Sequence, residues 1–175
     1  MLKIILIVIV LAVVGVCGFA LTKPDTFQVE RSATMRASPD ELYPMIADFH
    51  RWAEWSPWEK LDPEMARTHS GAASGTGAIY AWKGNSDVGE GKMEITDAAA
   101  PSKVTIKLDF IEPFASSAKT EFTLAPQGDS TTVRWVMSGE NNYMSKVMCV
   151  FMDMDSMIGK DFETGLANMK AAAEK

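Results

Sequence analysis

Residues that cross-link chains or bind metals are scarce in this sequence. Its 175 residues include two cysteines and two histidines. Cys17 and Cys149 lie far apart, and neither belongs to a Cys-x-x-Cys or Cys/His cluster, which excludes a disulfide framework and a zinc site. His50 and His69 have no carboxylate at metal-ligand spacing. We therefore expect no metal and no cofactor, and the cysteines leave the cellular compartment open.

Positive charge is also in short supply. The chain has 17 Lys and Arg residues against 23 Asp and Glu residues, a formal net charge of −6. No basic patch or Arg-rich helix pattern interrupts this acidic balance. Because an acidic domain repels phosphate backbones, we exclude nucleic acid as the main partner, and we exclude docking on anionic lipid by charge alone.

Charge is absent altogether from residues 4–21, a run of 18 apolar or small residues. As a helix this run would be about 27 Å long, close to the roughly 30 Å hydrocarbon core of a bilayer. The sequence therefore predicts a transmembrane anchor over residues 1–21 that contacts the membrane through residues 4–21. A short linker over residues 22–26 and one domain over residues 27–175 follow.

Two other interpretations of the N-terminal run stay open. Gly18-Phe19-Ala20 offers the small-x-small site of a cleaved signal peptide, although the run is longer than the apolar region of such signals. The stretch ending at Cys17 is similar to a lipoprotein signal, but Val16 stands where a small residue is expected. For an uncleaved anchor, we expect a single-pass protein of the bacterial inner membrane with the domain outside the cytoplasm.

The first part of the domain predicts a strand followed by a short helix. Apolar and polar residues alternate from Phe27 to Met35, which is the period of a half-buried strand. Ser38 and Glu41 then have the spacing of a capping box, and a proline occupies the first helical position between them. A second short helical piece, over residues 50–55, is expected before Pro57.

Residues 67–139 predict an antiparallel sheet. Five apolar sets alternate with charged residues and are separated by turns rich in Gly, Pro and Asn. Each strand therefore has one dry face and one wet face, as in a sheet that is covered on one side. The dry positions include Ile79, Trp82, Met93, Ile95, Val104, Ile106, Leu108, Phe110, Phe122, Leu124, Val133, Trp135 and Met137.

The last stretch predicts the element that covers this sheet. Apolar residues recur every three or four positions from Val147 to Met169, which is the spacing of one long amphipathic helix. Gly159 and Gly165 lie within it, and each costs a helix roughly 1 kcal/mol relative to alanine. Their presence indicates that the sheet or a ligand approaches the helix closely at these positions.

The order of these elements and several motifs resemble a known family. The most specific motifs are Trp52-x-x-Trp55-Ser56-Pro57-Trp58 and Ile158-Gly159-Lys160-Asp161-Phe162-Glu163-x-Gly165-Leu166. Supporting motifs are Ala37-Ser38-Pro39-Asp40-Glu41-Leu42, Tyr80-x-Trp82-x-Gly84-Asn85, Val88-Gly89-x-Gly91-x-Met93-x-Ile95, Phe110-x-x-Pro113-Phe114 and Trp135-x-Met137-x-Gly139. Over nearly the whole chain after the anchor, the sequence resembles the SRPBCC (START-like) superfamily, in particular its polyketide cyclase/dehydrase-like branch.

The resemblance implies an α+β helix-grip fold, in which a curved antiparallel sheet wraps around a long C-terminal helix. It also implies an elongated apolar cavity between the two. Relatives of this kind include lipid carriers, hormone receptors and aromatase/cyclases, so the resemblance implies no single activity. The residues expected to line the cavity are Trp55, Tyr80, Trp82, Met93, Ile95, Ile106, Leu108, Phe122, Trp135, Phe151 and Ile158.

Few side chains could perform chemistry in such a cavity. The dry strand positions supply no catalytic group, so only Tyr80, His50 or His69 could serve, and we assign no catalytic residue. Four acidic residues cluster loosely after the first helix and predict a solvated loop: Glu54, Glu59, Asp62 and Glu64. Three methionines recur every four residues and are typical of adaptable packing against a cavity or a membrane: Met144, Met148 and Met152.

Three functions stay open at this point. The favoured one is a membrane-tethered binding module that holds a hydrophobic small molecule or lipid in an internal cavity. The first alternative is an enzyme of cyclase or hydro-lyase type that acts on an apolar or polyketide-like substrate. The second alternative is a protein-interaction domain with a closed core. The sequence leaves the ligand and the oligomeric state open.

Overall fold

The fold is given by a computed structural model that describes the backbone of residues 1–175 and every side chain except that of Leu2. Helix α1 (Leu2–Ala20) comes first, followed by strand β1 (Thr26–Met35), helix α2 (Pro39–Ala47) and the 3-10 helices η1 (Phe49–Glu54) and η2 (Pro57–Lys60). Six strands follow: β2 (Ala66–Gly71), β3 (Ala78–Lys83), β4 (Glu90–Ala99), β5 (Lys103–Glu112), β6 (Ser116–Gln127) and β7 (Ser130–Glu140). The chain ends with helices α3 (Tyr143–Phe151) and α4 (Met154–Ala173).

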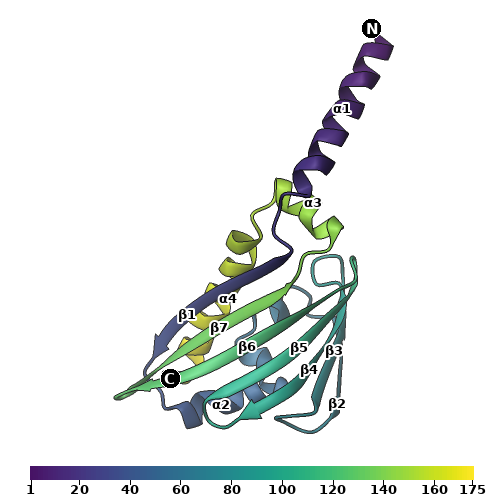
Figure 1. Cartoon of the computed structure of the whole chain (residues 1–175). Coiled ribbons are helices and arrows are strands. Elements are labelled where there is room, and N and C mark those ends of the chain that lie inside the picture. Colours follow the sequence, from purple (N-terminus) through teal and green to yellow (C-terminus); the bar gives the residue numbers. More distant parts are fainter.

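The seven strands form one antiparallel sheet in the order β1-β7-β6-β5-β4-β3-β2. Five of the six neighbouring pairs are consecutive in sequence, and the sixth joins the first strand to the last, from Thr26↔Glu140 to Met35↔Thr131. The sheet curves around α4, with α2 at one end and α1 projecting from the other (Figure 1). The predicted α+β helix-grip fold, a curved antiparallel sheet with a C-terminal helix, is confirmed.

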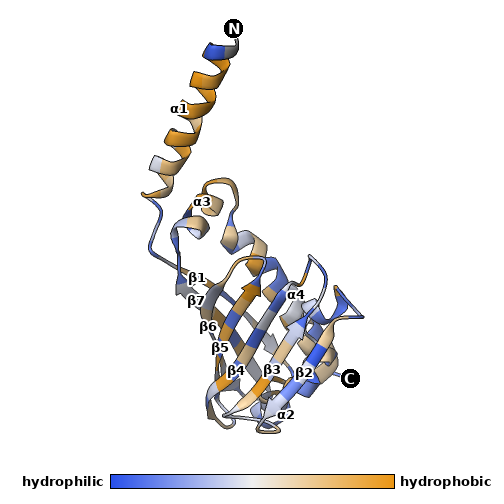
Figure 2. Cartoon of the chain, turned by 90° about the vertical axis from the view of Figure 1, so that its right-hand side faces the viewer, coloured by the Kyte–Doolittle hydropathy of each residue, from blue (hydrophilic) through white to orange (hydrophobic). Residues whose placement is uncertain are grey.

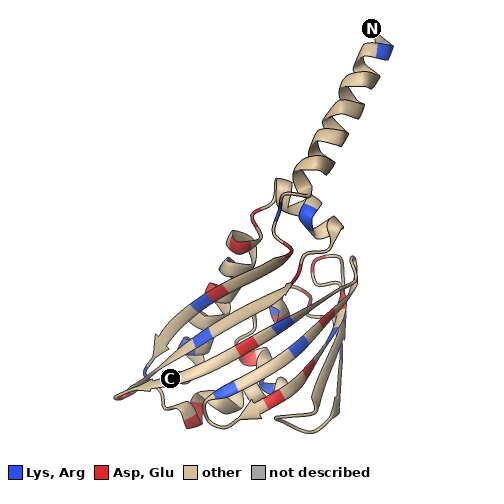
Figure 3. Ribbon diagram, viewed as in Figure 1, with Lys and Arg blue, Asp and Glu red and all other residues tan. Residues whose placement is uncertain are grey.

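One face of the sheet is dry and the other is charged, as the alternating pattern predicts. On β7, Val133, Trp135 and Met137 are buried, and the residues between them are partly exposed. Lysines, arginines and acidic residues alternate along the outer face of the middle strands (Figure 3), where Lys103 and Lys119 both pair with Glu121. The dry face therefore points toward α4, and the domain has one core.

Helix α1 stands apart from this core. Its segment Lys3–Ala20 is long and apolar enough to cross a membrane, and only 6% of that segment is buried in the rest of the chain. Figure 2 shows it as a mostly hydrophobic helix that projects from the domain. Such a helix has the properties of a membrane span, and a signal sequence would have them too.

The core is centred on the indole ring of Trp135. This ring stacks on Phe162 of α4 at 3.9 Å between ring centroids and 7° between ring planes. Trp55, Trp58 and Phe122 contact the same indole at 5.5, 5.9 and 4.7 Å. Its Nε1–H donates to Thr120 Oγ1 at 2.9 Å, so the one polar group of the ring has a partner. Five aromatic rings thus fill the space between the middle of the sheet and α4.

Both glycines of the C-terminal helix face the sheet. A Cβ at Gly159 would lie 2.0 Å from Nη2 of Arg31 on β1, and a Cβ at Gly165 would lie 3.0 Å from the Trp135 ring. The Arg31 guanidinium passes Gly159 to donate two hydrogen bonds of 3.1 Å to Asp155 and one of 2.8 Å to Glu163. The hydrogen bonds to Asp155 raise the pKa of Arg31 the most, and the bond to Glu163 raises it further. The close approach predicted from the two glycines is therefore made by the sheet.

The expectation of one continuous helix from Val147 to Met169 is wrong. Met152 has extended backbone angles, φ −127° and ψ 136°, so the chain breaks between α3 and α4. Asp153 then caps α4, because its Oδ1 accepts the backbone N–H groups of Asp155 and Ser156 at 3.2 and 3.4 Å. The capping Asp and Ser residues were a start signal for a helix. The apolar period continues across these capping residues, so the sequence pattern did not reveal the helix break.

Because Gly159 leaves space for the Arg31 side chain, the effect of Gly159→Ala on the free energy of unfolding should change sign when Arg31 is removed. In the native protein, Gly159→Ala should lower the free energy of unfolding by about 1 kcal/mol or more, because the new methyl group overlaps the guanidinium. In an Arg31→Ala background the same substitution should raise it by up to about 1 kcal/mol, since alanine is the better helix former. Chemical denaturation in detergent, followed by tryptophan fluorescence, measures both. Equal effects in the two backgrounds would contradict the assignment.

Candidate apolar-ligand site

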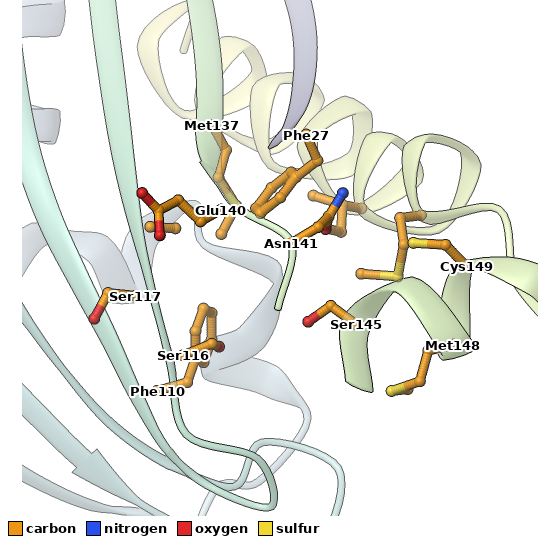
Figure 4. Close-up of a pocket in the computed structure, with 13 residues that line it drawn as sticks. Phe27, Phe110, Ser116, Ser117, Met137, Glu140, Asn141, Ser145, Met148 and Cys149 are labelled. Atoms are coloured by element: carbon orange, nitrogen blue, oxygen red, sulfur yellow. The ribbon is translucent and has the colours of Figure 1, made fainter. Parts of the chain in front are cut away.

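A small pocket lies at the end of the domain nearest to α1. It has a volume of about 160 Å³ and lies between the strand ends of the sheet and the α3–α4 segment. Figure 4 shows Phe110 and Ser116 on the strand side, and Met148 and Cys149 on the helix side. The residues that line it are Phe27, Phe110, Ser116, Ser117, Ala118, Met137, Glu140, Asn141, Ser145, Met148, Cys149, Met154 and Ile158.

Small residues on two strands make room for this pocket. Phe27 on β1 and Ala118 on β6 are both register partners of Gly139 on β7. A Cβ at Gly139 would lie 2.8 Å from the Phe27 ring, so glycine lets this ring lie over β7. Ala118 has only a methyl group at the floor, whereas the equivalent space further along the sheet is filled by Phe122 and Trp135. The pocket is therefore the part of the interior that the aromatic rings leave empty.

Asn141 at the pocket rim and its neighbour Asn142 have hydrogen-bond partners in the chain. The Asn141 side chain donates to the Pro24 carbonyl at 3.1 Å, and its backbone N–H donates to the Asp25 carbonyl at 2.8 Å. Asn142 caps α3 by accepting the Ser145 backbone N–H at 2.9 Å. These bonds tie the pocket rim to the linker that follows α1. The rim and the end of α1 are thus held together.

The structure distributes the eleven predicted cavity residues over three environments. Ile158 lines the pocket. Phe151 lies on α3 with its side chain 71% exposed, because the helix break removes the face that it was expected to share with Ile158. The other nine belong to the core or pack against it: Trp55, Tyr80, Trp82, Met93, Ile95, Ile106, Leu108, Phe122 and Trp135. Contact of these residues with a ligand stays a prediction.

Most pocket residues were missed at the level of sequence. Phe110, Met137 and Met148 were each recognised as apolar positions of a strand or of the methionine stripe. Nothing in the pattern separated them from the dry residues that fill the core, because both kinds have the same period. The small residues Ala118 on β6 and Gly139 on β7, which pair with each other, were the available signal for empty space.

A second cluster gathers the three residues named as possible catalytic groups. The His50 and His69 rings stack at 4.1 Å, and His69 lies 5.0 Å from the Tyr80 ring. Asp48 accepts from His50 Nδ1 at 2.9 Å. The pKa of His69 is lowered, mainly because its ring is buried and secondly because of the neighbouring His50. These residues lie where η1 meets β2 and β3, and none of them lines the pocket.

Glu59 corrects the expectation of a fully solvated acidic loop. Its side chain is only 9% exposed and accepts the Tyr80 hydroxyl at 2.5 Å and Arg67 Nε at 2.7 Å. Burial, then the hydrogen bond to Glu59, raises the pKa of Tyr80. A phenol held in this way stays protonated, and its hydroxyl group is already hydrogen-bonded to Glu59. The cluster therefore fastens η2 to β2 and β3 and leaves Tyr80 unavailable as a general base.

Comparison with protein families identifies the group to which this domain belongs. Residues 26–174 match the profile of the family described as polyketide cyclase / dehydrase and lipid transport. The chain belongs to this family. The resemblance to the SRPBCC superfamily, and to its polyketide cyclase-like branch, is thereby confirmed. No protein of curated function matches the sequence significantly.

Solved structures agree on the fold. Protein CV1439 from Chromobacterium violaceum is similar with a TM-score of 0.61 and 14% identity, covering 87% of this chain and 99% of its own. Major latex-like protein 151 from Panax ginseng has a TM-score of 0.62 and 15% identity, covering 87% and 100%. The Aha1 dimer from Colwellia psychrerythraea has a TM-score of 0.60 and 16% identity, covering 85% and 96%. At these identities the comparisons establish the shared fold of this family member and leave its ligand open.

The lowered pKa of His69 predicts a pH dependence of stability. The unfolded chain takes up a proton on this imidazole near its ordinary pKa of about 6.5, and the folded chain does so only at lower pH. The native protein should therefore lose stability from about pH 7.5 to about pH 5, and His69→Phe should lose less, because a phenyl ring keeps the stack without the charge. Thr68→Val, a neighbouring change that does not titrate, serves as control. Denaturation curves with the same pH slope for His69→Phe and the native chain would refute this account.

Proposed function

We propose that this protein is a membrane-tethered binding module that holds a hydrophobic small molecule or lipid in the pocket between the sheet and the α3–α4 segment. The observation that carries the proposal is the lining of that pocket. Seven of its residues are apolar and come from four strands and both C-terminal helices: Phe27, Phe110, Ala118, Met137, Met148, Met154 and Ile158. An apolar pocket with a few polar groups at its rim is the usual form of a small-molecule site.

The size of the pocket narrows the kind of ligand. A cavity of about 160 Å³ is similar to cavities that hold one benzene-sized molecule. Many pockets for whole drug-sized ligands are larger, at roughly 300–1,000 Å³. The pocket therefore suits one ring or one segment of an acyl or isoprenoid chain. The remainder of a longer ligand would extend past the rim.

The apolar helix α1 supports the tether. An apolar ligand partitions into the bilayer, and a domain fixed beside the bilayer meets it at a raised effective concentration. The rim of the pocket is bonded to the residues that follow α1, through Asn141 and the carbonyls of Pro24 and Asp25. The proposal includes an inner-membrane location in a bacterial cell with the domain outside the cytoplasm, in line with the sequence-based expectation.

An enzyme of cyclase or hydro-lyase type is the second candidate. The family description includes cyclases and dehydrases beside lipid transport. Glu140 and Cys149 are titratable residues at the pocket, on opposite sides in Figure 4. The binding module is the better supported function, because the three residues that could have served as catalytic groups (His50, His69 and Tyr80) lie in the separate cluster at β2 and β3.

Native mass spectrometry of the full chain, released from detergent micelles, tests the binding function. We expect one apolar molecule bound per chain, to be named by solvent extraction and fragmentation. Ala118→Phe places a ring in the pocket and should reduce occupancy about tenfold, which corresponds to roughly 1.4 kcal/mol. Ala99→Phe, at an exposed strand end outside the pocket, should keep native occupancy.

Either of two results would count against this function. One is a chain without bound apolar molecules that also takes up none when they are supplied. The other is equal occupancy in the native chain and in Ala118→Phe, which would place the ligand elsewhere. Recovery of a chemically altered ligand after incubation would instead favour the enzyme.

A further inference from the structure

Helix α3 is attached to the end of α1. The Tyr143 hydroxyl donates to the Cys17 carbonyl at 3.3 Å. The Lys146 ammonium pairs with Asp25, in the linker between α1 and β1. Figure 1 shows α3 at the base of α1, between that helix and the sheet. The position of α3 is therefore fixed relative to α1.

This attachment places α3 at a defined depth. Cys17 lies inside the apolar segment Lys3–Ala20, three residues before the end of α1, which is about 5 Å along a helix. A tyrosine that reaches this level of a membrane span lies in the interfacial layer, where tyrosine is enriched. If α1 spans a bilayer, α3 therefore lies against its surface.

The free face of α3 is apolar and large. Phe151 is 71% exposed, Met144 54%, Tyr143 48% and the adjoining Met152 44%. The only charged residue of the helix is Lys146, whose side chain is 13% exposed and already paired with Asp25. An exposed apolar patch of this kind marks a surface that contacts another protein, a membrane or a ligand.

Two more apolar side chains lie at the same end of the domain. Ile111 is 51% exposed at the end of β5, and Phe114 is 55% exposed in the β5–β6 turn. That turn points toward the α1 end of the domain (Figure 1). Two separate elements thus present apolar side chains in the direction in which α1 leaves the domain.

A different face of α3 lines the pocket. Ser145, Met148 and Cys149 of α3 are among the lining residues, and α4 contributes Met154 and Ile158. The helix is therefore the wall between the pocket and whatever covers the free face. Movement of this one helix would join the two spaces.

We propose that α3 is an interfacial helix, which inserts Tyr143, Met144, Phe151 and Met152 into the surface of the bilayer that α1 crosses. The pocket behind α3 then exchanges its apolar ligand with the acyl region of that leaflet without passage through water. This inference rests on the tether of the proposed function. The bilayer is the occupant that the structure favours, because the free face continues the apolar surface of α1 and has no charge for a protein partner to pair.

Fluorescence quenching in phosphatidylcholine vesicles tests the proposal. The full chain, with Cys17→Ser and Cys149→Ser, takes an environment-sensitive dye at Phe151→Cys or, as a second position, at Met144→Cys. Asp129→Cys, in the exposed β6–β7 turn at the far end of the domain, is the matched control. Phosphatidylcholine with a nitroxide on its acyl chain should remove most of the fluorescence at 151 and 144 and leave that at 129. Aqueous iodide should give the reverse order.

The outcomes separate this proposal from the tether beneath it. Protein that stays on vesicles through an alkaline carbonate wash, with dye at 151 and 144 quenched by lipid, supports the interfacial helix. Protein that stays but shows quenching by iodide at these positions overturns it and leaves the tether intact. Dye shielded from both quenchers assigns the face to a protein partner, which also overturns the proposal. Protein that washes off refutes the tether and the proposal together.

Discussion

The stacking of Trp135 on Phe162 is the contact on which the rest of the domain depends. It joins the second-to-edge strand β7 to the middle of α4, at a centroid separation of 3.9 Å. Because the indole is also contacted by Trp55, Trp58 and Phe122, one side chain sets the distance from the helix to the sheet and to both 3-10 helices. Gly165 has no side chain because this ring already occupies the space in front of it.

The same contact decides where the protein can be hollow. Buried aromatic rings occupy the interior from η1 to the middle of α4, where a helix-grip fold could enclose a long cavity. Toward β1 and α3, Ala118, Gly139 and several methionines leave space between the rings of Phe27 and Phe110 and α3, and the pocket begins there. This pocket thus lies in the part of the domain closest to α1. This placement is the observation on which the proposed binding function rests.

The sequence predicted the fold well because alternation and amphipathic spacing are local properties of the chain. The capping box at Ser38, the alternating strands and the close approach at Gly159 and Gly165 were each readable from a few neighbouring residues. The break at Met152 was not, since the apolar period runs through it and only the capping Asp153 interrupts it. The pocket could not be predicted in detail either. Whether a dry residue such as Met137 borders empty space depends on the size of the side chains that register pairing brings opposite it.

Photo-crosslinking tests the central claim most directly, namely that apolar ligand is held at the α3 end and excluded from the aromatic core. The full chain in vesicles is exposed to a fatty acid that has a diazirine at its methyl end, irradiated and digested for mass spectrometry. The account predicts adducts on pocket residues such as Met137, Met148 and Met154. Adducts on Trp55, Phe122 or Trp135 would show that the aromatic core opens to the ligand, and the account would then be wrong.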